Sequence, residues 1–201
     1  MCRRGSEDGF SLVDAMLTVC VIGIVAGIAL PMASGSIATQ RFRGDGQSVA
    51  NLVGLAKLRA AAQFTRARVR ADLTTNSYSM EVWDKATESW IADGGVQRAS
   101  TSVSFGFGGL DEPPPNTQAV IGLSPPCTDG VDAAADDIAD TACITFNSRG
   151  IPVDSTGAPA GGHAVYLTDG NTGVYAITVT ATPLIRLWWS PAHSPNWLEL
   201  Q

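Results

Sequence analysis

The chain has 201 residues and a formal net charge of −6; 45% of its residues are hydrophobic and only 16% are charged. This length allows one domain with a sizeable core, or one small domain with appendages. The negative net charge argues against a general nucleic-acid-binding protein, because such proteins need an excess of lysine and arginine to neutralise phosphates. The charges are uneven, since residues 41–70 carry seven basic side chains and one acid, Asp45.

A long apolar segment lies close to the start of the chain. It begins at Phe10, and residues 15–33 carry no charge. Its apolar residues would surround a helix on all sides, and about 20 such residues suffice to cross a bilayer. The sequence therefore predicts a transmembrane helix over residues 10–32. One carboxylate, Asp14, stands near the beginning of this segment.

Two ordinary explanations of the segment give Asp14 no role. In a cleaved secretory signal, Arg3 and Arg4 would form the basic region, but the apolar stretch is longer than the about 7–15 residues of such signals. In a plain membrane anchor, Asp14 would cost about 2.5–3.5 kcal/mol if it lay deep in lipid.

A third interpretation uses the spacing of four residues. A hydrophilic leader ends at Gly9, and Phe10 follows it. Counted from Phe10, Asp14 is the fifth residue and Pro31 is the twenty-second. This spacing resembles the N-terminal segment of type IV pilins and of the pseudopilins of type II secretion. The resemblance implies that a prepilin peptidase cuts between Gly9 and Phe10 on the cytoplasmic side, and that the new amine of Phe10 is methylated.

The resemblance also assigns a role to Asp14, at a position where the family usually has glutamate. A charge in apolar surroundings persists when it has a partner of opposite charge. In the family this carboxylate pairs with the amine of an adjacent subunit and sets the register of a helical filament, so Asp14 is the expected filament-assembly residue. The alternative is an acid tolerated at the membrane interface. Pro31 lacks an amide donor and is expected to kink the helix.

Residues 33–72 are expected to continue the helix on the periplasmic side, with an interruption around residues 44–46. Beyond the interruption, apolar residues recur at helical spacing. The basic residues of this region are expected to form a solvated face, or else a contact for acidic partners. They are Lys57, Arg59, Arg66, Arg68 and Arg70.

From residue 73 onwards the sequence changes to the alternation that is typical of strands. Residues 77–83 place Tyr78, Met80 and Val82 on one face. Further strands are expected at residues 102–107, 143–146, 164–167, 174–180 and 185–189. One long N-terminal helix followed by an antiparallel sheet domain is an α+β fold, which is also the pilin architecture.

Cys127 and Cys143 are the only cysteines in the polar part of the chain, and they bracket an acidic loop. Two such cysteines predict a disulfide if the domain lies in an oxidising compartment. Closing a loop of this size would contribute about 3 kcal/mol to stability. Zinc is not expected, because the chain has no C-x-x-C pair and both histidines lie far from the cysteines in sequence.

The later part of the chain is most similar to the H-type minor pseudopilins and to the T- and U-type minor pilins. The similarity rests on residues 58–69, on a strand and turn at residues 144–150, and on the last pair of strands. Some T-type minor pilins bind DNA through a Gly-Arg-x-Arg motif, whose matching positions here are residues 183–186. Only its second arginine, Arg186, is present. Arg186 is therefore a weak candidate contact, and nucleic acid is not an expected partner.

The remaining polar and aromatic residues offer little chemistry. Ca²⁺ prefers oxygen ligands, but the aspartates of the acidic loop do not follow the spacing of a known calcium loop. The weak calcium candidates are Asp132, Asp136, Asp137 and Asp140. No catalytic or phosphate-binding motif appears, so the sequence predicts neither an enzyme nor a cofactor. The tryptophans near the C-terminus, at positions 188, 189 and 197, are expected in the core rather than in a docking patch.

The sequence thus predicts four segments: a leader at 1–9, a transmembrane and assembly helix at 10–32, its periplasmic continuation at 33–72, and a β-rich periplasmic domain at 73–201. The expected protein is a minor pseudopilin, anchored in the bacterial inner membrane with its N-terminus in the cytoplasm. Its expected partners are prepilin peptidase, which is also the methylase, other pseudopilins or pilins, and an inner-membrane assembly platform. The alternatives are a minor type IV pilin of pilus assembly or DNA uptake, and a membrane-anchored binding protein.

Overall fold

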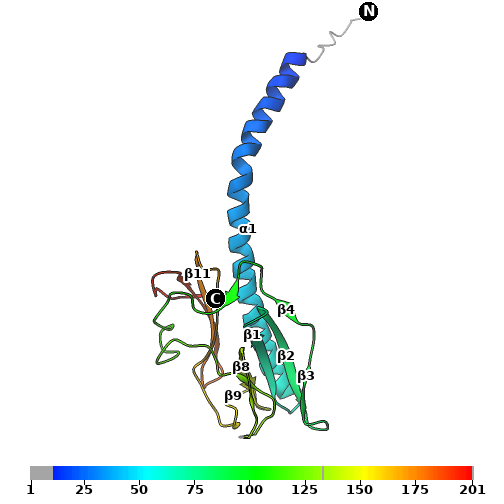
Figure 1. Ribbon diagram of the computed structural model, residues 1–201, viewed down its shortest axis with the longest axis vertical. Helices are drawn as coiled ribbons and strands as arrows, with labels where there is room; N and C mark the ends of the chain where they lie inside the picture. Colours follow the sequence, from blue (N-terminus) through cyan, green and yellow to red (C-terminus); the bar gives the residue numbers. More distant parts are fainter. Residues whose placement is uncertain (1–10, 133, 201) are drawn as a thin grey trace, which may run out of the picture. The chain divides into compact units, whose positions relative to one another are not determined.

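The computed structural model describes residues 11–132 and 134–200, and residues 28–34 only by their backbone. Helix α1 (Leu12–Ala62) comes first and is followed by strands alone (Figure 1). The chain divides into two compact units, residues 1–40 and 41–201, which are described separately. A helix with antiparallel sheets confirms the predicted α+β class.

The first unit consists of the N-terminal part of α1. Its large apolar side chains between Leu12 and Val25 are exposed. No helix among the described residues combines the length and the apolarity needed to cross a membrane. The predicted membrane segment, residues 10–32, includes residue 10 and side chains that lie outside the described part, and it stays a prediction.

Two predictions about the helix were wrong. First, α1 runs through residues 44–46 without interruption. Second, it ends at Ala62, so residues 67–72 form strand β1 (Ala67–Asp72) rather than a helical continuation. Phe64, two residues after the last helical residue, has a left-handed φ of 51°. The amide of Phe64 donates to the carbonyl of Ala61 (3.4 Å) and that of Thr65 to the carbonyl of Ala60 (3.2 Å), which is the Schellman arrangement.

The first sheet has the strand order β3–β2–β1–β8–β9, and β4 also pairs with β2. All of its pairings are antiparallel. Besides β1, its strands are β2 (Ser77–Asp84), β3 (Ser89–Ala92), β4 (Gln97–Arg98), β8 (Thr141–Phe146) and β9 (Pro152–Val153).

The second sheet has the order β13–β12–β11–β10–β5, again antiparallel, and a small third sheet pairs β6 with β7. The second sheet consists of β5 (Ser104–Phe105), β10 (His163–Thr168), β11 (Gly173–Val179), β12 (Ile185–Pro191) and β13 (Leu198–Leu200). The third consists of β6 (Cys127–Thr128) and β7 (Asp137–Ile138). Every predicted strand is confirmed, although the one expected at 102–107 is reduced to two residues.

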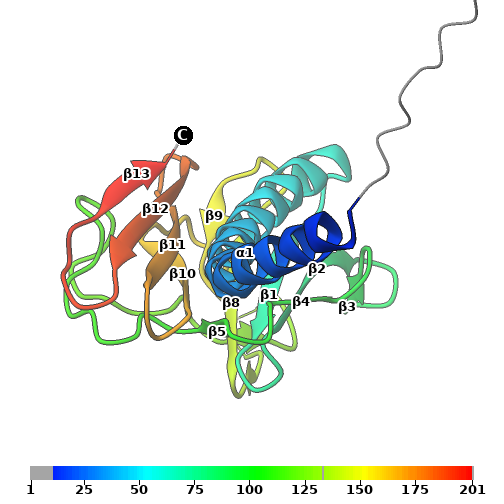
Figure 2. The ribbon, with the colours of Figure 1, turned by 90° about the horizontal axis from the view of Figure 1, so that it is seen from above.

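The main core of the second unit lies where α1 meets both sheets (Figure 2). Val49, Val53, Ala56 and Ala60 lie on one face of α1 and are fully buried. Their spacing of three and four residues is the helical period, and the small alanines allow close approach to the strands. A second cluster contains Trp188, which is 5% exposed, so the core interpretation is confirmed for this tryptophan.

Helix α1 continues through Gly44 and Gly46, and Gly46 has a packing role. A Cβ atom at Gly46 would lie 3.0 Å from Cγ of Tyr175 on β11. The ring of Tyr175 also packs edge-on against Phe42, with ring centroids 4.7 Å apart. The glycine is therefore a packing residue that lets an aromatic ring lie against the helix backbone.

Replacing Gly46 with alanine is expected to destabilise the protein by about 1 kcal/mol, because the ring of Tyr175 must move and this overpacking outweighs the gain in helix propensity. Gly54 is a matched control on the same helix, since a Cβ there meets nothing within 4 Å. Gly54→Ala is expected to stabilise by about 1 kcal/mol. Denaturant unfolding measures both variants, and equal stabilisation by the two would contradict this account.

Candidate functional site

The N-terminal end of α1 carries the predicted assembly residue, Asp14. The carbonyl of Ser11 accepts the amide of Ala15 (3.2 Å), and its Oγ accepts the amide of Val13 (3.3 Å). Ser11 is therefore the N-cap of α1, and Asp14 is the third residue of the first turn. Sequence reasoning missed Ser11, although a serine three residues before an acid at a helix start is a capping signal.

Asp14 is exposed in the first helical turn. A carboxylate there is favoured by the partial positive charge of the helix N-terminus. Gly9 and Phe10, the predicted cleavage and methylation residues, lie outside the described residues, so their relation to Asp14 stays a prediction. Helix α1 continues through Pro31, and the kink likewise stays a prediction.

The structure confirms the disulfide between Cys127 on β6 and Cys143 on β8, with their Cα atoms 4.9 Å apart. Hydrogen bonds reinforce the junction: the amide of Cys127 donates to Oγ1 of Thr141 (2.9 Å), and the amide of Cys143 donates to the carbonyl of Pro125 (2.8 Å). The bond therefore attaches the β6–β7 hairpin to the first sheet.

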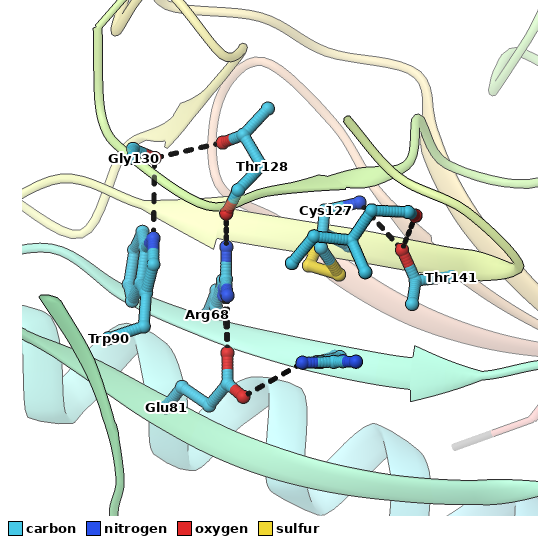
Figure 3. Close-up of polar contacts among 10 residues, drawn as sticks. Arg68, Glu81, Trp90, Cys127, Thr128, Gly130 and Thr141 are labelled. Carbon is cyan, nitrogen blue, oxygen red and sulfur yellow. Dashed lines mark hydrogen bonds and ion pairs between the residues drawn. A yellow bond between two sulfur atoms is a disulfide. The ribbon is translucent and has the colours of Figure 1, made fainter. Parts of the chain in front are cut away.

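Arg68 on β1 is the centre of a buried polar network in the globular unit (Figure 3). Its side chain is 2% exposed. Its Nε donates to Oε2 of Glu81 (2.6 Å), and its Nη1 donates to the carbonyl of Thr128 (2.5 Å). Its guanidinium carbon lies 4.0 Å from the centroid of the Trp90 ring. Burial lowers the pKa of Arg68, and the adjacent carboxylate of Glu81 opposes this shift.

The predicted solvated basic face is therefore wrong for Arg68, and its neighbours also have partners. Arg66 donates to the carbonyl of Val131 (2.7 Å), and Nη1 of Arg70 lies 3.6 Å from Oε1 of Glu81. These residues lie on or beside a strand and not on a helix. Arg68 and Arg70 contact Glu81 on the neighbouring strand β2, and Arg66 contacts the loop after β6.

The weak nucleic-acid candidate, Arg186, lies on β12. Its Nε is 3.4 Å from Oε1 of Glu199 on β13, and its guanidinium carbon lies 5.9 Å from the Trp188 ring centroid. The cation therefore contributes to the pairing of the last two strands.

The structure does not bring the weak calcium candidates together. Within residues 11–132 and 134–200, no group of three or more His, Cys, Asp or Glu side chains is placed to hold a metal ion. Oδ1 of Asp132 accepts the amide of Ala134 (3.0 Å), and Asp140 has a left-handed φ of 54° at the turn before β8. The acids of this loop have turn-forming roles.

His163, at the start of β10, is 5% exposed. Its Nε2 is buried and makes no hydrogen bond with any described residue. Burial lowers the pKa of His163, and the carboxylate of Asp154 opposes this shift. The sequence argued against this histidine as a zinc ligand and gave no indication of its burial.

Comparison with known proteins gives two similar solved structures. No protein-family model matches the chain, and no curated protein matches it. The two structures are both of the minor pseudopilin EpsH from the type II secretion system of Vibrio cholerae, each with 14% sequence identity. One covers 72% of this chain and 94% of its own, with a TM-score of 0.42; the other covers 77% and 97%, with a TM-score of 0.45.

Replacing Glu81 with glutamine is expected to destabilise the protein by about 3 kcal/mol, because the buried charge of Arg68 loses its counterion. Glu88→Gln is the matched control, since Glu88 lies on the same hairpin and is exposed; its effect should stay within about 0.5 kcal/mol. Denaturant unfolding tests both, and similar effects of the two variants would show that the Arg68 network is not important for stability.

Stability is expected to fall as the pH drops from about 7 towards about 5, because unfolded histidine binds a proton near about pH 6.5 before buried His163 does. The sign follows from the lowered pKa of His163: its contribution is present above the unfolded pKa and is lost below it. His163→Gln should flatten this part of the profile, whereas His193→Gln, at an exposed site, should not. Urea unfolding across this pH range measures the difference, and an unchanged slope in His163→Gln would refute the assignment.

Proposed function

We propose that this chain is a minor pseudopilin of a type II secretion system, a structural subunit that supports protein export within a short pilus-like filament or at its tip. The observation that carries the proposal is the spacing of Gly9, Phe10, Asp14 and Pro31. The α+β fold agrees with it, because the pilin architecture is a long N-terminal helix with an antiparallel sheet domain.

In this proposal, prepilin peptidase removes residues 1–9 and creates a new amine at Phe10. The ammonium would stand at the edge of the apolar segment, four residues before Asp14 in the sequence. Asp14 makes no ion pair with another described residue, so its carboxylate is available to the amine of an adjacent subunit. The pairing would compensate two charges in apolar surroundings, where an unpaired charge is costly.

The exposed apolar side chains of residues 12–25 have a role in the same mechanism. In the inner membrane they would contact lipid, and in the filament they would contact equivalent helices of neighbouring subunits. Gly23 and Gly27 have the G-x-x-x-G spacing, and a Cβ at either would meet nothing within 4 Å. Such a spacing allows close approach of a second helix.

The alternative is a minor type IV pilin, because the same N-terminal spacing occurs in that class. In either system the globular unit would lie in the periplasm, where the disulfide can form. Purification of the chain with its bound partners from cells that make both kinds of subunit would decide between them. Recovery of secretion pseudopilins supports the proposal, and recovery of pilus subunits alone supports the alternative.

Asp14→Ala is expected to leave peptidase cleavage intact and to reduce incorporation into filaments to background, because the neighbour's amine loses its counterion. Asp14→Glu should retain incorporation. Mass spectrometry of the mature N-terminus, which should begin at methylated Phe10, reports processing; cysteine crosslinking to other subunits reports incorporation.

Ser11→Ala separates the assembly role of Asp14 from helix capping. This variant should lose about 1 kcal/mol of helix stability through loss of the cap but should still incorporate. If Asp14→Ala incorporates normally, or if Ser11→Ala fails to the same degree, the assigned role of the carboxylate is wrong.

A further inference from the structure

Helix α1 covers only part of the second sheet, whose strands β12 and β13 lie on the side away from it (Figure 2). On the face that packs against α1, Tyr175 and Ile177 of β11 are buried. Their cross-strand neighbours on β12, Trp189 and Leu187, share this face and are half-buried. The neighbour of Trp189 on β13 is Leu198, which is 52% exposed. Burial therefore decreases from strand to strand towards the edge of the sheet.

The width of the sheet explains this decrease. Neighbouring strands lie about 4.8 Å apart, so the axes of five strands span about 19 Å. A helix with its side chains is about 10 Å in diameter and covers only two or three strands. Leu187, Trp189 and Leu198 thus form an apolar shelf, which the chain's own helix does not cover and which has the width of a second helix.

The flank of α1 that faces the second sheet is partly open. Gly46 lies against the ring of Tyr175 on β11, and Lys57 donates to the carbonyl of Pro183 just before β12 (2.8 Å). These two contacts identify the side of the helix that faces this sheet. Gly54 lies two turns after Gly46 and on nearly the same side. A Cβ at Gly54 would meet nothing within 4 Å, so there is open space at this point of the flank.

The same helix carries an apolar ridge, formed by Leu55 and Leu58. These side chains are 46% and 67% exposed. Residues three apart are neighbours on a helix surface, and this pair lies on the side opposite to the buried residues Val53 and Ala56. Neighbouring side chains of this kind form the ridges that pack against a second element. The globular unit thus has an apolar ridge on one element and an uncovered apolar shelf on others.

We propose that the ridge of one subunit packs on the shelf of a second copy of this chain, beside the α1 helix of that copy. The inference rests on the proposed function, in which the α1 helices of neighbouring subunits contact one another through residues 12–25. A contact between two different surfaces is heterologous, and it leaves one ridge and one shelf free for further subunits. It therefore suits a filament, whereas a two-fold symmetric contact would end at a dimer.

The size of the two surfaces favours a partner that is already held nearby. Exposed apolar patches on single proteins cover about 300–600 Å², and a stable interface buries about 1,200 Å² or more. The ridge and the shelf alone would therefore not keep two free proteins together. Subunits held side by side through residues 12–25 have a high local concentration, at which a small contact can form. This requirement favours a second copy over an unrelated soluble partner.

Crosslinking between two differently tagged copies of the full chain, in membranes of cells that make both, tests the contact. Both copies carry Cys2→Ser and Cys20→Ser, which remove the cysteines outside the disulfide. One copy carries Leu58→Cys on the ridge, and the other carries Leu198→Cys on the shelf. A bifunctional maleimide that reaches about 10 Å, one helix diameter, links the thiols. The expected product is a dimer with both tags, about tenfold more abundant than dimers of equal copies.

Val120→Cys is the matched control for the shelf cysteine, because Val120 is exposed and lies outside the shelf. Its yield with Leu58→Cys should be at background. An equal yield with this control would indicate random collision, and a majority of dimers between equal copies would indicate a two-fold interface. Adducts with other proteins alone would show that a different subunit occupies the shelf. Each of these three outcomes would overturn the proposal.

Gly54→Trp tests whether the second copy lies against the flank of α1. The open space at Gly54 should allow this variant to fold, which urea unfolding checks. The indole would fill the space that the partner needs, and it should lower the yield of the ridge–shelf dimer about tenfold. Gly54→Ala is the matched control and should stay within about twofold. An unchanged yield in a folded Gly54→Trp variant would contradict the proposal.

The native Cys20 separates this inference from the proposed function. In two tagged copies without the ridge and shelf cysteines, a crosslink between their Cys20 residues reports contact of the segments at residues 12–25. That crosslink without the ridge–shelf product would overturn the ridge–shelf contact and leave the proposed function standing. Absence of both products would overturn the contact and also count against association of copies through α1.

Discussion

The globular unit depends on the buried guanidinium of Arg68. This one group joins Glu81 on β2, the Trp90 ring on β3 and the carbonyl of Thr128 on β6, which are distant from one another in sequence. A planar guanidinium can do so because its edges donate hydrogen bonds while its face stacks on an aromatic ring. A lysine ammonium could not meet all three partners. Because an uncompensated buried charge is costly, the position of the β6–β7 hairpin is coupled to the pairing of β1 with β2.

The disulfide adds a second, covalent attachment one residue away from the first. Cys127 is bonded to Cys143 on β8, and the next residue, Thr128, receives the hydrogen bond from Arg68. Two attachments at adjacent positions restrict the hairpin more than either alone, since the second limits rotation about the first. The hairpin also supplies Thr128 and Asp137 to the wall of a cavity of about 190 Å³, which His163 lines as well. The polar network thus shapes a surface feature as well as stabilising the fold.

The features that the sequence predicted correctly are those set by local spacing or by a small number of possibilities. The disulfide followed because only two of the four cysteines lie in the polar part of the chain, and the strands from residue 77 onwards followed from alternation. The end of α1 could not be predicted, because the left-handed residue that follows the helix is Phe64, where glycine is usual. The burial of Arg68 could not be predicted for another reason. Its side chain is covered by Thr128 on β6, 60 residues later in the chain, and local periodicity holds no information about so distant a contact. Gly46 indicated a break, whereas it makes room for Tyr175.

The beginning of α1 suggests how aspartate can serve where the pilin family usually has glutamate. Ser11 caps the helix, and Asp14 lies in its first turn, where the helix dipole favours a carboxylate by about 0.3–1 kcal/mol. This attraction acts within a single chain and needs no partner. In the proposed filament, the amine of a neighbouring Phe10 would meet the same carboxylate in apolar surroundings, where the attraction between unit charges is several times stronger than in water. The attraction between the carboxylate and the neighbouring amine would then be stronger than the attraction of the carboxylate to the helix dipole. Because the side chain of aspartate is shorter than that of glutamate, the neighbouring amine would have to approach the helix backbone more closely.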